Sequence, residues 1–232
     1  MKLAIMQPYI LPYIGYFQLI SSVDFFLACD NMQYTRKGWI NRNRILQNGK
    51  DILFSLPLKH ASQTANISER EITSDFNRER FLKQFSNAYK KCVFFEQTLP
   101  LLERILGHQD LNLFNFNLNS IKTVCDYLGI QTKIGRTSDI PINPLLKKEE
   151  RVIALCQSLN ADTYINSIGG RELYSKDRFK NNGISLAFLE SSPLEYKQFH
   201  PHFIPWLSIV DILMFNPIER VREMVSSNYE LV

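Results

Sequence analysis

Three short segments of the chain hold residue types that could bind a ligand. The first runs from Gln7 to Tyr16, and its tyrosines Tyr13 and Tyr16 are three residues apart, so they share one face of any helix they occupy. Gly15 between them would let a ligand approach the backbone closely. Pro12 suits the first position of a helix, and a helix N-terminus attracts anions. A proline-rich turn with two core tyrosines is the alternative, which the sequence leaves open.

The second segment, residues 30–44, combines amide, aromatic and basic side chains in one loop. Guanidinium groups bind phosphate or carboxylate through paired hydrogen bonds, and asparagine side chains can read a polar ligand. We expect Lys37, Arg42 and Arg44 to balance charge that develops during catalysis. The ligand-binding candidates of this segment are Asp30, Gln33, Trp39, Asn41 and Asn43. A solvated basic loop is the alternative.

The third segment follows an apolar run that ends at Asn166. Gly169 and Gly170 come directly after it, and a glycine pair between a strand and a helix can cradle phosphate with backbone amides. No Gly-Lys-Ser/Thr follows, so this is neither a Walker loop nor a dinucleotide fingerprint. The hypothesis is a ligand loop built from Asn166, Gly169 and Gly170, and a plain tight turn is the alternative.

The remaining reactive residue types form no catalytic or metal motif. The four cysteines are more than thirty residues apart and each lies in an apolar stretch, which indicates reduced core cysteines. The four histidines lack zinc spacing, so no metal site is expected, and no Gly-x-Ser-x-Gly elbow is present. Asp211 lies in an apolar helical run, where a buried partner of an arginine or of a backbone donor is expected rather than a catalyst. No side chain stands out as nucleophile or general base.

The elements that must position these segments are short apolar strands separated by helical patterns. Strands are expected at residues 3–6, 24–29, 132–137, 162–166 and 184–189. This alternation predicts an open, mostly parallel, Rossmann-like α/β sheet in one domain over residues 1–232. An insert at about residues 44–128 holds a β-hairpin around Asn48-Gly49 and then helices. Because such sheets bind ligands beyond the carboxyl ends of their strands, we expect the three segments to converge on one cleft.

Composition and charge limit the classes of binding partner that are expected for this chain. The chain has 232 residues, 45% of them hydrophobic, and a formal net charge of +4 without long basic runs, so nucleic acid is not an expected partner. A small anionic substrate is a better use of the modest basic surplus. No segment reaches the apolar length of a membrane span, and Pro8 and Pro12 interrupt the apolar start before a signal peptide could form. These features predict a cytoplasmic protein.

Together the segments resemble the WbqC-like protein family of bacterial polysaccharide gene clusters. The matching residues are Gln7-Pro8, residues 12–20, Asp30, Gln33, Lys37, residues 39–44, residues 164–166, Gly169-Gly170, Leu173-Tyr174 and residues 208–211. The resemblance spans nearly the whole chain. It implies a role in O-antigen (lipopolysaccharide) biosynthesis, with transfer of glycine or a similar amino acid to an amino sugar.

A looser similarity links the first segment to the nucleotidyltransferase-like superfamily. There a His-x-Gly-His motif follows the first strand, opens a helix and contacts ATP phosphates. The corresponding residues here are Tyr13-Ile14-Gly15-Tyr16, so tyrosine replaces both histidines. A phenol can donate a hydrogen bond to phosphate but carries no positive charge at neutral pH. The similarity implies ATP as a possible cofactor, with Lys37, Arg42 and Arg44 supplying the missing charge.

The leading hypothesis is a transferase that joins an activated small carboxylic or amino acid to the amine of a nucleotide-linked sugar. Gln7, Tyr13, Gly15 and Tyr16 would hold a nucleotide, while Trp39, Asn41 and Asn43 would position the acceptor. ATP or a preformed acyl donor would activate the acid. The rival hypothesis is a non-catalytic module that binds a nucleotide or a sugar nucleotide in a biosynthetic complex. The sequence does not indicate an oligomeric state.

Overall fold

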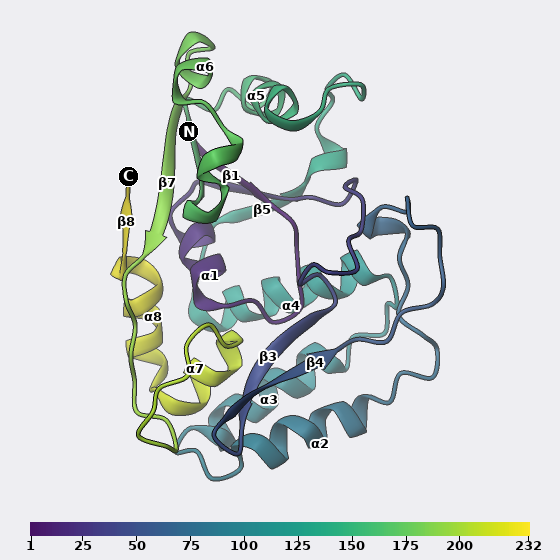
Figure 1. Cartoon of the computed structure of the whole chain (residues 1–232), viewed down its shortest axis with the longest axis vertical. Coiled ribbons are helices and arrows are strands. Elements are labelled where there is room, and N and C mark those ends of the chain that lie inside the picture. Colours follow the sequence, from purple (N-terminus) through teal and green to yellow (C-terminus); the bar gives the residue numbers. More distant parts are fainter.

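A six-stranded sheet runs through the computed structural model, which describes residues 1–232 (Figure 1). The strand order is β5-β2-β1-β6-β7-β8, and every neighbouring pair is parallel except the antiparallel β7–β8 pair. The strands are β1 (Lys2–Met6), β2 (Phe25–Ala28), β5 (Lys133–Arg136), β6 (Thr163–Ser167), β7 (Ser185–Ser191) and β8 (Tyr229–Leu231). The expected α/β sheet and its five parallel strands are confirmed. The short edge strand β8 was not expected.

Helices cover both faces of the sheet because successive strand residues point to opposite faces. Ala4, Phe26 and Ile165 face a large core that includes α1 (Ile14–Ser21), α4 (Leu113–Leu128) and α8 (Ile218–Ser227). Leu3, Leu27 and other alternate residues face a smaller core against α5 (Lys148–Ser158) and α6 (Lys176–Asn181). This two-sided burial explains why the strand sequences are continuously apolar.

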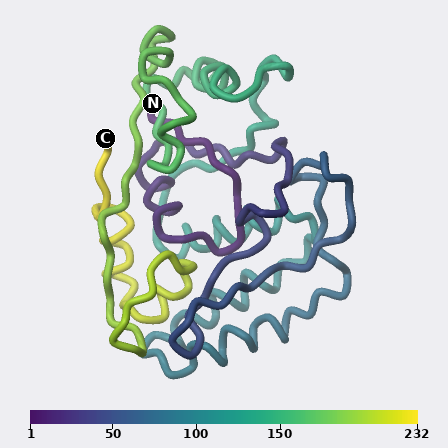
Figure 2. Tube along the Cα trace, in the orientation of Figure 1, coloured from purple at the N-terminus to yellow at the C-terminus, as the bar shows by residue number.

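The hairpin forms a separate two-stranded sheet, β3 (Arg42–Gln47) and β4 (Lys50–Ser55). Asn48 and Gly49 both adopt positive φ, as the Asn-Gly signal predicts for a two-residue turn. Phe54 of β4 packs edge to face on Phe81 and Phe85 of α2 (Arg78–Tyr89). Figure 2 shows the hairpin, α2 and α3 (Phe95–Leu106) at the end of the molecule opposite to α5 and α6.

The strand order determines which connection passes over the middle of the sheet. Because β5 and β6 lie on opposite sides of the β2-β1 pair, the connection that carries α5 must cross over β2 and β1. Strand order reverses at β1, with β2 on one side and β6 on the other, so β1 marks the switch point of the sheet. The short helices are η1 (Ile67–Glu69), η2 (Thr137–Asp139), η3 (Ile168–Leu173) and α7 (Ile209–Phe215).

A buried polar network ties the hairpin to the C-terminal part of the chain. Asp211 of α7 has no exposed surface and accepts hydrogen bonds from the hydroxyls of Tyr89 (2.8 Å) and Tyr196 (2.6 Å) and from Nε2 of Gln198 (2.9 Å). The Tyr89 hydroxyl in turn accepts the backbone N–H of Leu46 in β3. Burial raises the pKa of Asp211 above its ordinary value, and the three donors oppose that rise. The carboxyl therefore joins donors from separate elements, and its partners are tyrosine and glutamine rather than an arginine.

Candidate functional site

The connection after β1 is fixed by side chains from distant parts of the chain. Asn43 is buried, and its Nδ2 donates to the carbonyls of Ile10 (3.2 Å) and Leu11 (2.6 Å). The Ser208 hydroxyl also donates to the carbonyl of Leu11, at 2.8 Å. Leu11 has φ +44, and α1 begins at Ile14 instead of at Pro12, with Tyr13 as its N-cap residue. Asn43 therefore holds the backbone of this connection.

Tyr13 and Tyr16 lie in different surroundings. Tyr16 is 3% exposed and packs against Tyr9, Phe17 and Phe26, and burial raises its pKa well above the ordinary value. Tyr13 instead lies 5.2 Å from the Trp206 ring, on the surface near Ser191. A Cβ on Gly15 would lie 2.9 Å from the Ser191 hydroxyl oxygen, so a larger residue there would have to displace this hydroxyl. Tyr16 is thus a core residue, and the core-tyrosine alternative holds for it.

Asp30 and Asn31, at the end of β2, tie that strand to β5. Oδ1 of Asp30 accepts hydrogen bonds from the Thr137 hydroxyl (2.8 Å) and the Ser138 N–H (3.1 Å). Burial alone would raise the pKa of Asp30, but these hydrogen bonds outweigh it and the pKa lies below the ordinary value. Oδ1 of Asn31 accepts from Thr137 and from Arg151 of α5. Asp30 is thus committed to protein donors.

The basic residues of the second segment surround the start of the hairpin. Arg42 donates from Nε to the Gly38 carbonyl (2.9 Å) and from Nη2 to the Lys37 carbonyl (2.6 Å). Arg44 pairs with Asp51 at 2.8 Å and donates to the Trp206 carbonyl. Both guanidinium groups lie over the ring of Trp39, which is 47% exposed. Asn41 accepts from the Tyr34 hydroxyl and donates to the Leu56 carbonyl. Each guanidinium group is therefore held in place by two hydrogen bonds to the protein.

The main cavity lies at the switch point of the sheet, with a volume of about 640 Å³. Its floor is the carboxyl ends of β1, β2 and β6, and α5 and η3 form its sides. Apolar side chains from these elements, such as Ile5, Val152 and Leu173, line much of it. Four amide side chains reach it, namely Gln7, Asn31, Gln33 and Asn166.

Positive charge gathers on the α5 side of this cavity. Lys147, Lys148 and Arg151 line it, and no aspartate or glutamate does. None of the three pairs with a carboxylate, because Glu149 and Glu150 are both engaged by Arg178. Lys147 and Lys148 lie at the start of α5, whose first turn also holds Glu149 and Glu150. An anion bound in the cavity would neutralise the charge of the lysines and of Arg151.

The glycine pair borders the same cavity, on the β6 side. A Cβ on Gly170 would lie 2.6 Å from Nδ2 of Asn166, so only glycine allows this approach. Gly169 faces open space within 4 Å of its Cβ position. Oδ1 of Asn166 accepts the backbone N–H of Ser167 at 2.8 Å, which leaves its Nδ2 as a donor. This side of the cavity is neutral and polar.

The thiol of Cys29 and the phenols of Tyr164 and Tyr174 in the walls of the cavity are neutral at physiological pH. Burial raises the pKa of the Cys29 thiol to about 12, with Arg151 lowering it and Asp30 raising it to smaller extents. Burial also raises the pKa of Tyr164 well above, and that of Tyr174 above, the ordinary tyrosine value. These groups are poor bases at neutral pH. All four cysteines are free and buried, as expected. No group of three His, Cys, Asp or Glu side chains lies close enough to hold a metal ion.

The expectation of one shared cleft is wrong. Gln7, Gln33, Asn166, Gly169 and Gly170 line the main cavity. Tyr13 borders a different cavity with Trp206, and Asn41 and Arg42 border a third beside the hairpin. Residues 40–43 are instead fixed against the connection that follows β1. Asn43 donates to the Leu11 carbonyl, and Asn117 donates to the carbonyls of Pro8 and Ile40.

The cationic residues of the main cavity were missed in the sequence. Lys147-Lys148 reads as an isolated basic pair, and Arg151 as an ordinary helix surface residue. Only the strand order of the sheet could have indicated that these cations line the cavity. A helix that connects an edge strand to a strand beyond the switch point must pass over the ligand-binding edge, and its first turn can then reach the ligand. That inference needs the strand order, which one sequence does not supply.

The fold and the cavity together define an open α/β protein with a cavity at its switch point. The chain belongs to the WbqC-like protein family, whose model matches residues 7–223.

A protein of Mycobacterium tuberculosis, the uncharacterized protein Rv1507c, is 30% identical over 215 residues, which cover 91% of this chain and 92% of that protein. No solved structure matches the chain. None of the helices combines the length and the apolar character needed to cross a membrane.

Proposed function

We propose that the switch-point cavity binds a nucleotide-linked amino sugar and that the protein transfers an activated small carboxylic acid, such as glycine, to the sugar's amine. The observation that carries this proposal is the set of three cations without a carboxylate partner, Lys147, Lys148 and Arg151, at one side of an otherwise apolar and amide-lined cavity. The family resemblance supplies the biological setting, the synthesis of a bacterial surface polysaccharide.

The two sides of the cavity suit the two ends of such a ligand. A diphosphate group carries negative charge that the lysines, Arg151 and the N-terminus of α5 would neutralise. The apolar wall suits the flat face of a nucleobase, and the amides of Gln7, Gln33 and Asn166 suit its polar edge or the sugar hydroxyls. A volume of about 640 Å³ lies within the range of small-molecule sites.

The transfer requires an acid whose hydroxyl has been converted into a good leaving group. In this proposal the acid arrives either as an acyl adenylate made from ATP or as an acyl thioester. The neutral sugar amine attacks the acyl carbon, the amide bond forms, and the bond from the acyl carbon to adenosine monophosphate or to the thiolate sulfur breaks. The proton lost by the amine goes to the leaving group or to water. Since the thiol and phenol groups of the wall are poor bases at neutral pH, the protein would act by orientation and by its fixed positive charge.

One observation favours a second candidate, a non-catalytic module that binds a sugar nucleotide. The pKa values of Cys29, Tyr164 and Tyr174 in the cavity are raised away from neutrality, whereas many catalytic sites tune the pKa of an acid or base toward it. A binding module would need the same cations and amides but no transfer step. The two candidates therefore share a ligand and differ in turnover.

The experiment incubates the protein with a uridine-diphosphate-linked amino sugar and glycine plus ATP, or with a glycyl thioester. Mass spectrometry then looks for the glycyl amide of the sugar. A product that Arg151→Ala reduces at least tenfold supports the transferase. Retention of the sugar nucleotide in native mass spectra without any product would support the binding module. If neither product nor bound sugar nucleotide is observed, the proposal fails.

A further inference from the structure

A second cavity beside the hairpin is strongly basic. It measures about 340 Å³, and arginines 36, 42 and 70 line it together with Lys59 and His60, without any aspartate or glutamate. It differs from the main cavity in this concentration of guanidinium groups. Nothing in the proposed function uses it.

Arg70 is the buried anchor of this second cavity. Its residue is 8% exposed, its guanidinium lies 4.6 Å from the Tyr34 ring, and Nη2 donates to the Lys59 carbonyl at 3.1 Å. Its Nε is buried and has no hydrogen-bond partner. No carboxylate lies within ion-pair distance of Arg70, although the nearby Lys59 pairs with Glu71 at 2.7 Å. A buried charge without a counter-ion is costly, so an anion in the cavity would remove a real penalty.

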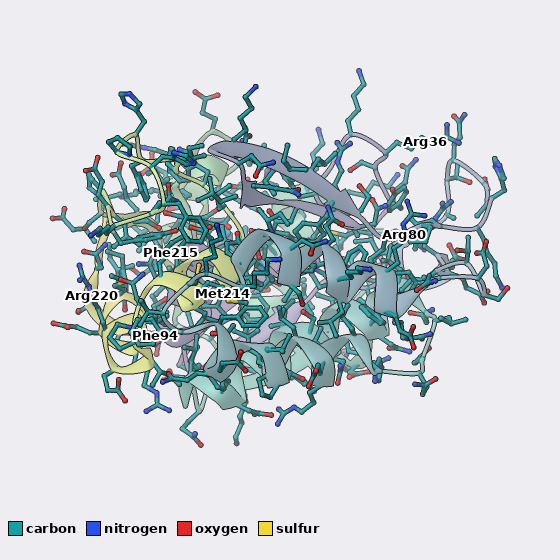
Figure 3. All side chains as sticks on the ribbon, turned by 90° about the horizontal axis from the view of Figure 1, so that it is seen from below. Arg36, Arg80, Phe94, Met214, Phe215 and Arg220 are labelled. Carbon is teal, nitrogen blue, oxygen red and sulfur yellow. The ribbon has the colours of Figure 1, made fainter.

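The other two arginines are also free to receive an anion. Arg42 is braced by the carbonyls of Gly38 and Lys37, which accept from Nε and Nη2 and leave Nη1 without a protein partner. Arg36 is exposed and pairs with no carboxylate (Figure 3). The cavity therefore offers three positive charges that the protein does not neutralise, one of them fixed by burial and one by hydrogen bonds.

The two cavities are neighbours that lie on opposite sides of one loop. Gln33 lines the main cavity, while the next residue, Tyr34, lines the basic one. The loop between them is braced, because Nε2 of Gln33 donates to the Gln63 carbonyl at 2.8 Å and Gln33 pairs with Asn66 as a β-bridge. A ligand in one cavity thus does not occupy the other.

We propose that the basic cavity is a second, separate binding site for a diphosphate group. A single carboxylate would leave two of the three charges uncompensated, whereas a diphosphate carries several. Guanidinium forks match phosphate oxygens with paired hydrogen bonds, and Arg is favoured over Lys where such planar recognition matters. The cavity is roughly ten times the volume that one water occupies in the liquid, which is room for more than one phosphate group.

Calorimetric titration with inorganic pyrophosphate tests this site. Both the wild-type protein and the Arg151→Ala variant, whose change lies in the main cavity, should bind pyrophosphate. Arg36→Ala should weaken that binding about tenfold and Arg70→Ala about a hundredfold, as expected for lost charge-assisted hydrogen bonds. The matched control is Arg80→Ala on α2, an exposed arginine on the same side of the molecule (Figure 3), which should leave the affinity unchanged.

Arg36 carries the decisive comparison because its side chain makes no hydrogen bond in the fold, so its loss cannot act through misfolding. Equal affinities for Arg36→Ala and Arg80→Ala, or no saturable binding in the wild type, would overturn the proposal. Uridine diphosphate distinguishes the source of the group. Tighter binding than pyrophosphate identifies a nucleotide, and equal binding identifies the free inorganic anion; both results support the site if they depend on Arg36. Loss of binding in Arg151→Ala alone would assign the anion to the main cavity and reject a second site.

Discussion

At the scale of single residues, the chain separates side chains that look alike in the sequence. Asn43 lies at the start of β3 and Asn166 near the end of β6. The sequence predicted a ligand contact for both. Asn43 is buried and spends both its amide hydrogens on the carbonyls of Ile10 and Leu11. Asn166 keeps its Nδ2 at the wall of the main cavity, beside Gly170. The structural role of Asn43 depends on partners more than thirty residues away along the chain.

The first prediction follows for Asn43. Asn43→Ala should lower the free energy of unfolding by about 2–3 kcal/mol, because the buried Ile10 carbonyl and the N–H of Arg44 lose their partner and the Leu11 carbonyl keeps only Ser208. Urea denaturation followed by circular dichroism measures this. The control is Asn87→Ala on the exposed face of α2, which should be neutral or slightly stabilising because alanine favours helix. A neutral Asn43→Ala would show that this asparagine is free for a ligand after all.

At the scale of elements, helix α5 matters most for the site. Its first residue, Lys148, has φ +49, a left-handed conformation that costs a non-glycine residue about 1 kcal/mol. Its first turn also carries Glu149 and Glu150, which suit the positive end of the helix dipole, beside Lys147 and Lys148. The strain at Lys148 is a local cost to the fold, of the kind that is often found at ligand sites.

The second prediction tests this balance. Lys148→Gly should raise the free energy of unfolding of the unliganded protein by about 1 kcal/mol, because glycine accepts positive φ. It should also weaken binding of an anionic nucleotide. Lys147→Gly is the matched control, since it removes the same charge from a residue with φ −130, where glycine relieves no strain. Thermal unfolding of both variants measures the change in stability, and nucleotide titration measures the change in affinity. Equal stability changes in the two variants would show that Lys148 is not strained.

Sequence patterns predicted these elements well because the signals are local. Apolar runs marked the parallel strands, and Asn48-Gly49 marked the hairpin turn. Helix α1 was placed two residues too early because the positive φ of Leu11 depends on Asn43 and Ser208. A local pattern cannot report a bond to a residue so distant along the chain.

At the scale of the whole molecule, the candidate site was only half predictable. Gln7, Gln33, Asn166 and the glycine pair follow strands of one sheet, so the rule about carboxyl ends placed them together. Lys147, Lys148 and Arg151 arrive by a crossover whose path depends on strand order. Arg42 belongs to the separate hairpin and lines the cavity beside it, together with Arg36 and Arg70. The residues that line a cavity therefore depend on the strand order and the path of the connections as well as on residue type.

The central claim is that the main cavity holds an anionic nucleotide-linked sugar against the cations of α5. Calorimetric titration of a uridine-diphosphate-linked amino sugar tests it most directly, in protein that carries Arg36→Ala so that the second cavity contributes little. Adding Arg151→Ala should weaken binding about ten- to a hundredfold, the effect of a lost charge-assisted hydrogen bond. Adding Arg222→Ala instead, which removes an exposed guanidinium on α8, should change nothing. Equal affinities in these two variants would contradict the account.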